Sequence, residues 1–373
     1  MFLTERAISL ATYAIVLLIS CSLMNRVARK QYKIILFFYL IVICVFAFNY
    51  KPYFTADLYR LREYMEYYVN NSWPDVIQYA LKSDRPAWVL YSWLLSRLGN
   101  ENWLQTITCF WTFGNVFYII GSEIERNNII YDRAIGLFYI MAIGAFYLQT
   151  ISGIRSMLAI SIVAYCIYTE LFRQHSIIIH IPLYLFSGLL HPVGMVLVLS
   201  RLIFLLFQEK SIRRRIPLSI LAILLLLFVV AFLRRYLNSS LDYGSGYLSN
   251  RNQYTYKWEI IIGLLEIGES YYINWKYHKC SNANDMGNAL MKFSNLWLSI
   301  SLISLPFSYS VFRRFSIFAT LVSLPMVYHT STVMGEDYIS YSIYRRDILI
   351  ISSIIFVLSL LRGDLCGYKF FVL

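Results

Sequence analysis

A single arginine, Arg155, interrupts a long apolar stretch of the chain. Between Ala134 and Tyr168 it is the only residue with a formal charge, and Ser152 and Gly153 stand shortly before it. These small residues predict a break between two helices, which would put the guanidinium at a membrane–water boundary. A cation in such a place usually faces a water-filled cavity or an anionic ligand. The alternative is that the long side chain merely reaches the lipid headgroups.

A histidine stands in a second predicted break, within Gly188-Leu-Leu-His191-Pro192. Proline disfavours helical backbone at the residue before it, so His191 should separate two apolar runs. An imidazole in such a break can donate a hydrogen bond to a polar ligand or accept a proton near neutral pH. It can equally satisfy a backbone carbonyl freed at the kink.

The segment from Thr55 to Asn71 predicts an amphipathic helix, because its apolar residues recur at helical spacing. Asp57 falls in the first turn, where the helix dipole favours an anion. In a functional interpretation, Asp57 is a base or an orienting group and Arg60 is a phosphate ligand. In the alternative, the helix lies on the membrane surface, and its arginines form weak pairs with Glu63 and Glu66.

Two adjacent arginines, Arg313 and Arg314, stand in a predicted joint between apolar runs, from Ser308 to Phe315. Such a pair ordinarily marks the cytoplasmic side of a membrane protein. The count of crossings places this joint outside, so either the arginines bind an anion there or one predicted span does not cross.

The composition predicts an integral membrane protein. Of 373 residues, 58% are hydrophobic and 14% are charged, and the mean hydropathy is +0.56. We therefore expect one all-α domain over residues 1–373, a polytopic helical bundle of about 11–13 transmembrane helices with an outer-face cavity. The net charge of +12 is explained by basic cytoplasmic joints and does not indicate nucleic-acid binding.

Charge also predicts the orientation of the spans. The basic joints at residues 25–33 and 210–215 belong in the cytoplasm, which puts residues 50–86 and 234–257 outside as two external loops, the first with the amphipathic helix. The count is consistent only if the short run at residues 87–98 is re-entrant or interfacial, or if a later run fails to cross. The predicted spans lie near residues 7–24, 34–49, 103–121, 134–150, 154–171, 176–190, 193–207, 216–233, 258–275, 291–307, 315–329 and 347–361.

Several catalytic signatures are missing from the sequence. It contains no P-loop, no GxSxG, no HExxH and no other pattern of metal ligands. The DxD pattern that holds a divalent cation against a nucleotide sugar is also missing. We therefore expect no metal and no cofactor, and nucleotide-sugar chemistry is disfavoured.

The order of these features resembles the EpsG-like and Wzy-type membrane proteins that polymerise bacterial surface polysaccharides. The resemblance consists of D57-L-Y-R60-L-R-E-Y64, then G153-I-R155-S-M-L-A-I, then L190-H191-P-V-G, and then F312-R313-R314-F. It covers most of the chain, although each motif is short. The family pattern often has Gln where this chain has Ser156, and a Gly shortly before the acidic residue of the loop.

The resemblance implies a metal-independent glycosyltransferase, such as an O-antigen polymerase, in the bacterial inner membrane. It would join undecaprenyl-diphosphate-linked repeat units at the outer face, and a chain-length regulator would be a further partner. Arg155 and either Arg313 or Arg314 would contact diphosphate with help from Arg60, since preorganised cations stabilise a developing anion. His191 is the first candidate for the general base and Asp57 the second. Tyr64 would line the glycan path.

Two other classes compete with a polymerase. A flippase for lipid-linked glycans would have similar spans and arginines, but it should also show two related halves, and the sequence shows no internal symmetry. A membrane O-acyltransferase usually has an arginine and a histidine near its N-terminus, whereas the first histidine here is His175. A structural scaffold is a third alternative.

Overall fold

The chain folds into helices throughout the part that the structure describes. The structure is a computed structural model that describes residues 32–52, 57–126, 133–208, 253–279, 285–306, 308–334 and 338–365, with isolated positions at 15, 16, 19, 220, 223, 224, 227 and 231. Over these residues it has no strand, which confirms the all-α prediction. Most of the predicted spans 7–24 and 216–233, and of the second external loop 234–257, lies outside the described residues.

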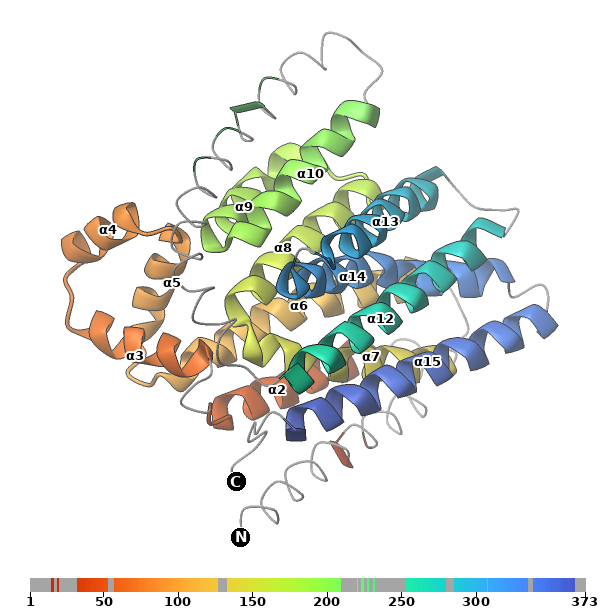
Figure 1. Ribbon diagram of the computed structural model, residues 1–373, viewed down its shortest axis with the longest axis horizontal. Helices are drawn as coiled ribbons and strands as arrows, with labels where there is room; N and C mark the ends of the chain where they lie inside the picture. The colour runs from red at the N-terminus through yellow and green to blue at the C-terminus, as the bar shows by residue number, and fades with distance from the viewer. Residues whose placement is uncertain are drawn as a thin grey trace.

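Long helices lie side by side in a bundle, and three short helices, α3 to α5, gather at one side of it (Figure 1). The short helices are α3 (Asp57–Val69), α4 (Trp73–Lys82) and α5 (Pro86–Ser96). The longer helices are α2 (Tyr32–Asn49), α6 (Asn102–Arg126), α7 (Arg133–Ser152), α8 (Ile154–Leu171), α9 (Ile177–Leu190), α10 (Pro192–Gln208), α12 (Gln253–Lys279), α13 (Asp285–Ser304), α14 (Tyr309–Met334) and α15 (Tyr338–Leu365).

Two of the described helices are long and apolar enough to cross a membrane. They are Ile154–Leu171 in α8 and Tyr309–Ser331 in α14, and shorter apolar helices run over Lys33–Asn49, Phe138–Ile151, Ile177–Leu190 and Pro192–Leu206. Helix α8 is the centre of the bundle, because it is buried almost from end to end and packs against α6, α9, α10 and α14.

The two breaks that the sequence predicts are present. Helix α7 ends at Ser152 and α8 begins at Ile154, with Gly153 between them, and α9 ends at Leu190 two residues before α10 begins at Pro192. Helices α9 and α10 approach so closely that a Cβ atom on Gly194 would lie 2.3 Å from the carbonyl oxygen of Ser187. Only glycine fits at position 194 without moving this backbone.

Helices α3 to α5 leave and rejoin the bundle at the same end. The guanidinium of Arg62 on α3 donates to the carbonyl oxygen of Tyr50, just after α2, and to Glu101, just before α6. The end of α2 and the start of α6 therefore lie together.

Helix α5 is too short to cross a membrane as a straight helix. It has 11 residues, about 16 Å of helix, whereas the hydrocarbon layer is about 30 Å thick.

Two local predictions on charged residues are wrong. The segment from Ser308 to Phe315 is not a joint, because α14 already begins at Tyr309 and the amide of Phe312 donates to the carbonyl of Ser308. The surface pairs predicted on α3 also differ. Arg60 pairs backwards with Asp57, and Arg62 pairs with Glu101 on another element.

Candidate anion-binding site

Five helices direct their N-terminal ends toward one region of the molecule. Helices α3, α5, α8, α10 and α14 begin at residues 57, 86, 154, 192 and 309. Asp57 and Arg155 lie in the first turns of α3 and α8, Arg85 and His191 directly precede α5 and α10, and Arg314 lies in the second turn of α14. Helix N-termini attract anions, because their free amide groups and the helix dipole both present positive charge. The fold thus favours a negatively charged ligand at this end, which we call the site end.

The contact between Asp57 and Arg155 joins α3 to the central helix α8. The guanidinium Nη2 of Arg155 lies 3.1 Å from Oδ2 of Asp57, while Nη2 of Arg60 lies 2.7 Å from the other carboxylate oxygen. The side chain of Arg155 is 16% exposed and that of Asp57 is 41% exposed. Three residues that the sequence nominated separately are therefore in direct contact.

Burial by itself would raise the pKa of Asp57. The charges of Arg155, Arg60 and Arg85 outweigh that effect and hold the pKa below its ordinary value. Asp57 is therefore ionised at neutral pH.

Arg85 is a site residue that the sequence analysis missed. It caps the N-terminus of α5, immediately before Pro86, and its charge acts on Asp57, Arg155 and His191. Helix α5 also supplies Trp88, whose ring centroid is 5.8 Å from the Cζ atom of Arg155, a cation–π distance. The signal in the sequence was an Arg-Pro pair at the start of a short apolar run next to the predicted external helix.

His191 lies at the same end, buried in the turn between α9 and α10. Its Nδ1 accepts a hydrogen bond of 3.1 Å from the amide of Val193, so the neutral ring carries its proton on Nε2. Burial, and then the charges of Arg314, Arg85 and Arg155, lower the pKa of His191 well below its ordinary value. This geometry favours His191 as a hydrogen-bond donor, and it makes Asp57 the better candidate for a base.

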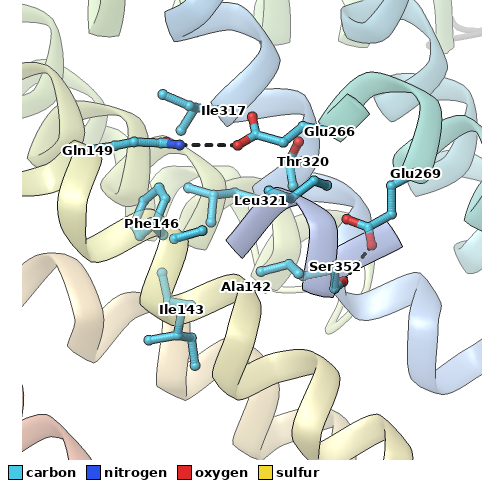
Figure 2. A pocket seen from close by; sticks show the side chains of 14 residues that line it. Ala142, Ile143, Phe146, Gln149, Glu266, Glu269, Ile317, Thr320, Leu321 and Ser352 are labelled. Carbon is cyan, nitrogen blue, oxygen red and sulfur yellow. Dashed lines mark hydrogen bonds between the residues drawn. The ribbon is translucent and has the colours of Figure 1, made fainter. Parts of the chain in front are cut away.

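A cavity lies deeper in the bundle than the site end, between α6, α7, α12, α14 and α15 (Figure 2). Its wall includes Gln149, Glu266 and Glu269, and it contains none of the arginines at the site end. This interior cavity is therefore not the predicted outer-face cavity.

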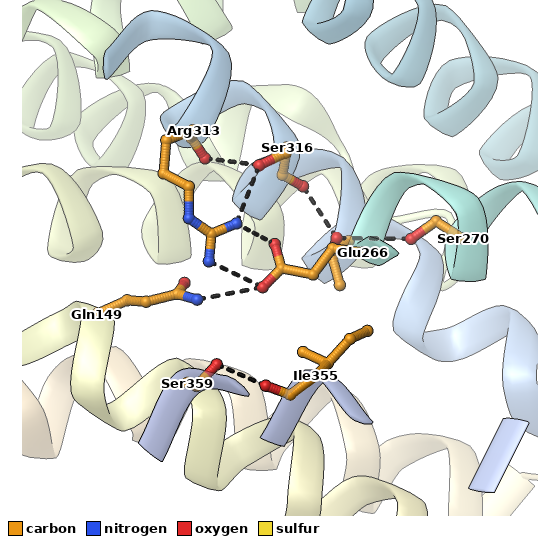
Figure 3. A network of polar contacts seen from close by, with 8 residues as sticks. Gln149, Glu266, Ser270, Arg313, Ser316, Ile355 and Ser359 are labelled. Carbon is orange, nitrogen blue, oxygen red and sulfur yellow. Dashed lines mark hydrogen bonds and ion pairs between the residues drawn. The ribbon is translucent and has the colours of Figure 1, made fainter. Parts of the chain in front are cut away.

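Arg313 belongs to a buried network beside this cavity and not to the site end (Figure 3). Its Nη1 and Nη2 both bond the carboxylate of Glu266, Nη2 at 2.9 Å, and the amide of Gln149 donates to the same carboxylate at 3.1 Å. Arg313 is 6% exposed. Both terminal nitrogens of its guanidinium bond a carboxylate inside the bundle. Of the two arginines that the sequence analysis nominated, Arg314 is therefore the one whose charge acts at the site end.

The site end carries an excess of positive charge among the described residues. Arg60, Arg85 and Arg155 act on Asp57, Asp84 pairs with Arg85, and the charge of Arg314 acts on His191. Tyr64, which the sequence nominated for a glycan path, is on α3 and is 55% exposed. Among the described residues no group of three or more His, Cys, Asp or Glu side chains is arranged to hold a metal ion.

Comparison of the chain with protein-family models, with curated proteins and with solved structures finds no match.

Proposed function

We propose that this protein is a glycosyltransferase of the bacterial inner membrane. It would transfer a glycan from undecaprenyl diphosphate to a second lipid-linked repeat unit, on the outer side of the membrane. The observation that carries the proposal is the Asp57–Arg155 contact between α3 and α8, with Arg60, Arg85, Arg314 and His191 around it. These groups match a substrate that has a diphosphate leaving group and a hydroxyl nucleophile.

A multi-pass membrane protein is supported by large apolar side chains on the outside of the bundle. On α2 and α15 they recur at helical spacing, as Ile34, Phe37, Phe38, Ile41 and Val45, and as Ile350, Ile354, Val357 and Leu361. Exposed apolar surface of this extent is typical of a face covered by lipid or by another protein. The interior, by contrast, holds charged pairs such as Glu266 with Arg313.

The proposed orientation is supported by basic residues at the end opposite the site. Lys33 begins α2, Arg173 follows α8, and Lys276 and Lys279 end α12. Basic residues at the ends of spans favour the cytoplasmic side. The site end then faces outward, where lipid-linked repeat units are joined.

In the proposed reaction, the acceptor hydroxyl oxygen forms a bond to the anomeric carbon of the donor glycan. The bond from that carbon to the diphosphate oxygen breaks, and its electron pair leaves with the diphosphate. Arg155, Arg314, Arg85 and Arg60 stabilise the developing charge, because arginine binds phosphate oxygens through a planar fork of donors. The Nε2–H of His191 adds a neutral donor.

Asp57 takes the proton from the acceptor hydroxyl. Its low pKa makes it a weak base, which suits an oxocarbenium-like transition state in which the glycosidic bond breaks before the proton moves. Binding of the diphosphate to Arg155 also draws that arginine away from Asp57, which leaves the carboxylate available to the acceptor. Tyr64 lies one turn beyond Arg60 on α3 and offers an exposed ring on which a sugar could stack.

The test is the substitution Arg155→Lys in cells that lack the wild-type gene. Lysine keeps the charge but loses the fork of donors, so we expect the long polysaccharide ladder to collapse to single repeat units at equal expression. Loss of one preorganised donor costs about 100-fold in rate or more. Arg346→Lys is the matched control, because Arg346 is 68% exposed at the far end of the bundle.

Equal chain lengths for Arg155→Lys and wild type would remove Arg155 from the mechanism. Purified protein in vesicles separates the competing class: translocation of lipid-linked units without any joining would establish a flippase in place of the polymerase.

A further inference from the structure

The exposed face of α3 is made of tyrosines and glutamates. Between Asp57 and Tyr68, its exposed side chains are those of Tyr59, Glu63, Tyr64, Glu66 and Tyr67. Helix α2 differs, because its large exposed apolar side chains are isoleucine, phenylalanine and valine. A tyrosine ring is apolar on its faces and polar at its hydroxyl, and a carboxylate accepts hydrogen bonds. The combination on α3 fits a ligand that presents both apolar surface and hydroxyl groups.

Three exposed tyrosines form a stripe that starts at the site end. Tyr64 and Tyr67 follow Asp57 and Arg60 at helical spacing, so these four side chains share one side of α3. On α4, Tyr79 meets Tyr67: the two ring centroids are 5.7 Å apart, and the two hydroxyl groups are in hydrogen-bond contact. We call Tyr64, Tyr67 and Tyr79 the tyrosine stripe.

Tyr68 is buried between the stripe and the site end. Its burial, and then the neighbouring hydroxyl groups of Tyr64, Tyr67 and Tyr79, raise the pKa of Tyr68, whereas the charge of Arg155 acts to lower it. One phenol therefore senses all three members of the stripe and the central arginine of the site. The stripe adjoins the candidate anion-binding site.

The turn between α3 and α4 is fastened to α5. Arg97, at the end of α5, donates to the carbonyl oxygens of Val69 at 3.0 Å and Asn71 at 2.5 Å, and Nε1 of Trp93 donates to Asn71 at 3.2 Å. The three helices also share a small apolar core, made of Tyr68, Val76, Ala80 and Val89. The tyrosine of α4 is therefore held beside that of α3 before a ligand binds, which lowers the entropic cost of binding.

The charge of this surface favours one class of ligand. The exposed charged side chains of α3 and α4 are three carboxylates and one lysine, namely Glu63, Glu66, Asp75 and Lys82. Carboxylates repel an acidic sugar, and equally the anionic headgroup of a phospholipid. They accept hydrogen bonds from hydroxyl and amino groups. An uncharged or amino-bearing sugar chain meets both conditions.

We propose that the tyrosine stripe binds an oligosaccharide that lacks acidic sugars. Sugar rings stack on the tyrosines, which offer a large rigid contact surface, and Glu63 accepts hydrogen bonds from their hydroxyl groups. Residues 57 to 67 span about 15 Å of helix, which is longer than one sugar ring, so the stripe holds the sugars that follow the reacting one. The inference rests on the proposed function, because it names the class of glycan that the reaction would join.

The experiment measures equilibrium binding of tritium-labelled oligosaccharides to the purified full chain in detergent. They are made by partial hydrolysis of the surface polysaccharide of the cells that carry the gene, so they have neither lipid nor diphosphate. We expect Tyr67→Ala to weaken binding about tenfold, and Tyr67→Phe, which keeps the ring, to bind nearly as well as wild type. Tyr118→Ala, the same change at an exposed tyrosine of α6, is the matched control and should bind like wild type. Added salt should leave the affinity unchanged, because an uncharged ligand forms no ion pairs.

Equal binding by wild type, Tyr64→Ala and Tyr67→Ala would overturn the inference and leave the stripe as an anchor at the membrane surface. A polysaccharide rich in acidic sugars, or binding that salt abolishes, would overturn it as well. Failure of the proposed function gives a different result. If Arg155→Lys leaves the polysaccharide length unchanged while Tyr67→Ala still loses oligosaccharide binding, the glycosyltransferase proposal fails and the sugar site stands. If Arg155→Lys shortens the polysaccharide but wild type binds no oligosaccharide, the sugar site alone is wrong.

Discussion

Arg313 and Arg314 are adjacent in the chain, but they belong to two regions with opposite charge balance. Arg313 points into the bundle, where both arms of its fork bond Glu266 and Gln149 supports the same carboxylate. Arg314 is half-buried at the site end, where its charge acts on His191. Successive residues on a helix point about 100° apart, so one step along α14 separates the two environments.

The difference distinguishes a structural arginine from one that can bind a ligand. In the interior, the charge of Arg313 is balanced by a carboxylate that no ligand needs to displace. At the site end, Arg60, Arg85 and Arg155 share the carboxylates of Asp57 and Asp84, and Arg314 adds a fourth positive charge beside His191. An anion is therefore expected to bind where positive charge exceeds negative charge, and an arginine alone does not indicate such a site.

The largest expected effect comes from exchanging these two arginines for glutamine one at a time. Arg313→Gln leaves Glu266 buried without its ion partner, which costs about 3–5 kcal/mol. Arg314→Gln should change the free energy of unfolding by about 0.5 kcal/mol or less, yet it should shorten the polysaccharide. Chemical unfolding in mixed micelles and a chain-length gel measure the two effects. An equal loss in the free energy of unfolding for Arg313→Gln and Arg314→Gln would contradict the distinction between the two arginines.

A smaller effect is expected where Trp88 faces Arg155. The cation–π contact at 5.8 Å should be worth about 1 kcal/mol. A double-mutant cycle of Trp88→Leu with Arg155→Gln measures it as a coupling in the free energy of unfolding. Trp88→Phe keeps a ring and is the matched control, with a smaller loss than Trp88→Leu. Strictly additive variants would show that the contact contributes nothing.

The smallest effect is the pH dependence of the contact between α3 and α8. The folded-state pKa of Asp57 is below its ordinary value of 3.8, so the ionised carboxylate stabilises the fold above that pH. This contribution is lost as the pH falls through 3.8 toward the folded value. The side chain is 41% exposed, and solvent screening limits the contribution to about 0.5 kcal/mol.

The measurement compares the unfolding temperatures of wild type and Asp57→Asn as a function of pH. The two should differ at pH 7 and converge below pH 3.8. The exposed carboxyl group of Glu66, on the same helix, provides a control: Glu66→Gln should follow the wild-type curve. A constant difference at every pH would contradict the assignment.

The sequence was sufficient for features that depend on local backbone chemistry. Gly153 and Pro192 end one helix and begin another, as their limited or special backbone preferences predict. That Arg155 and His191 lie at one end also follows from such breaks, because a chain that turns at Gly153 and again at His191 returns to the same end. The contact of 3.1 Å between Asp57 and Arg155 is an outcome that counting spans could not supply.

The sequence was insufficient where facing direction decides the role. Whether the side chain of Arg313 or of Arg314 points into the bundle depends on the residue at which α14 begins. The sequence analysis placed a joint from Ser308 to Phe315, whereas α14 already begins at Tyr309. Glu266 and Glu269 were overlooked inside a predicted span, although carboxylates within an apolar run commonly mark functional positions. The partner of Glu266 is 47 residues away, a separation that no local pattern reveals.

The tight approach of Gly194 to Ser187 has a consequence for how a bulky substrate could enter. Because α9 and α10 are in direct backbone contact, they form a rigid pair. This pair fixes the position of His191, which lies in the turn between them. Helices α3 to α5, by contrast, are fastened to the bundle through side chains, among them those of Arg62 and Asp57. If a bulky substrate needs room, the movement is therefore expected in α3 to α5, which carry Asp57, and not in the turn that carries His191.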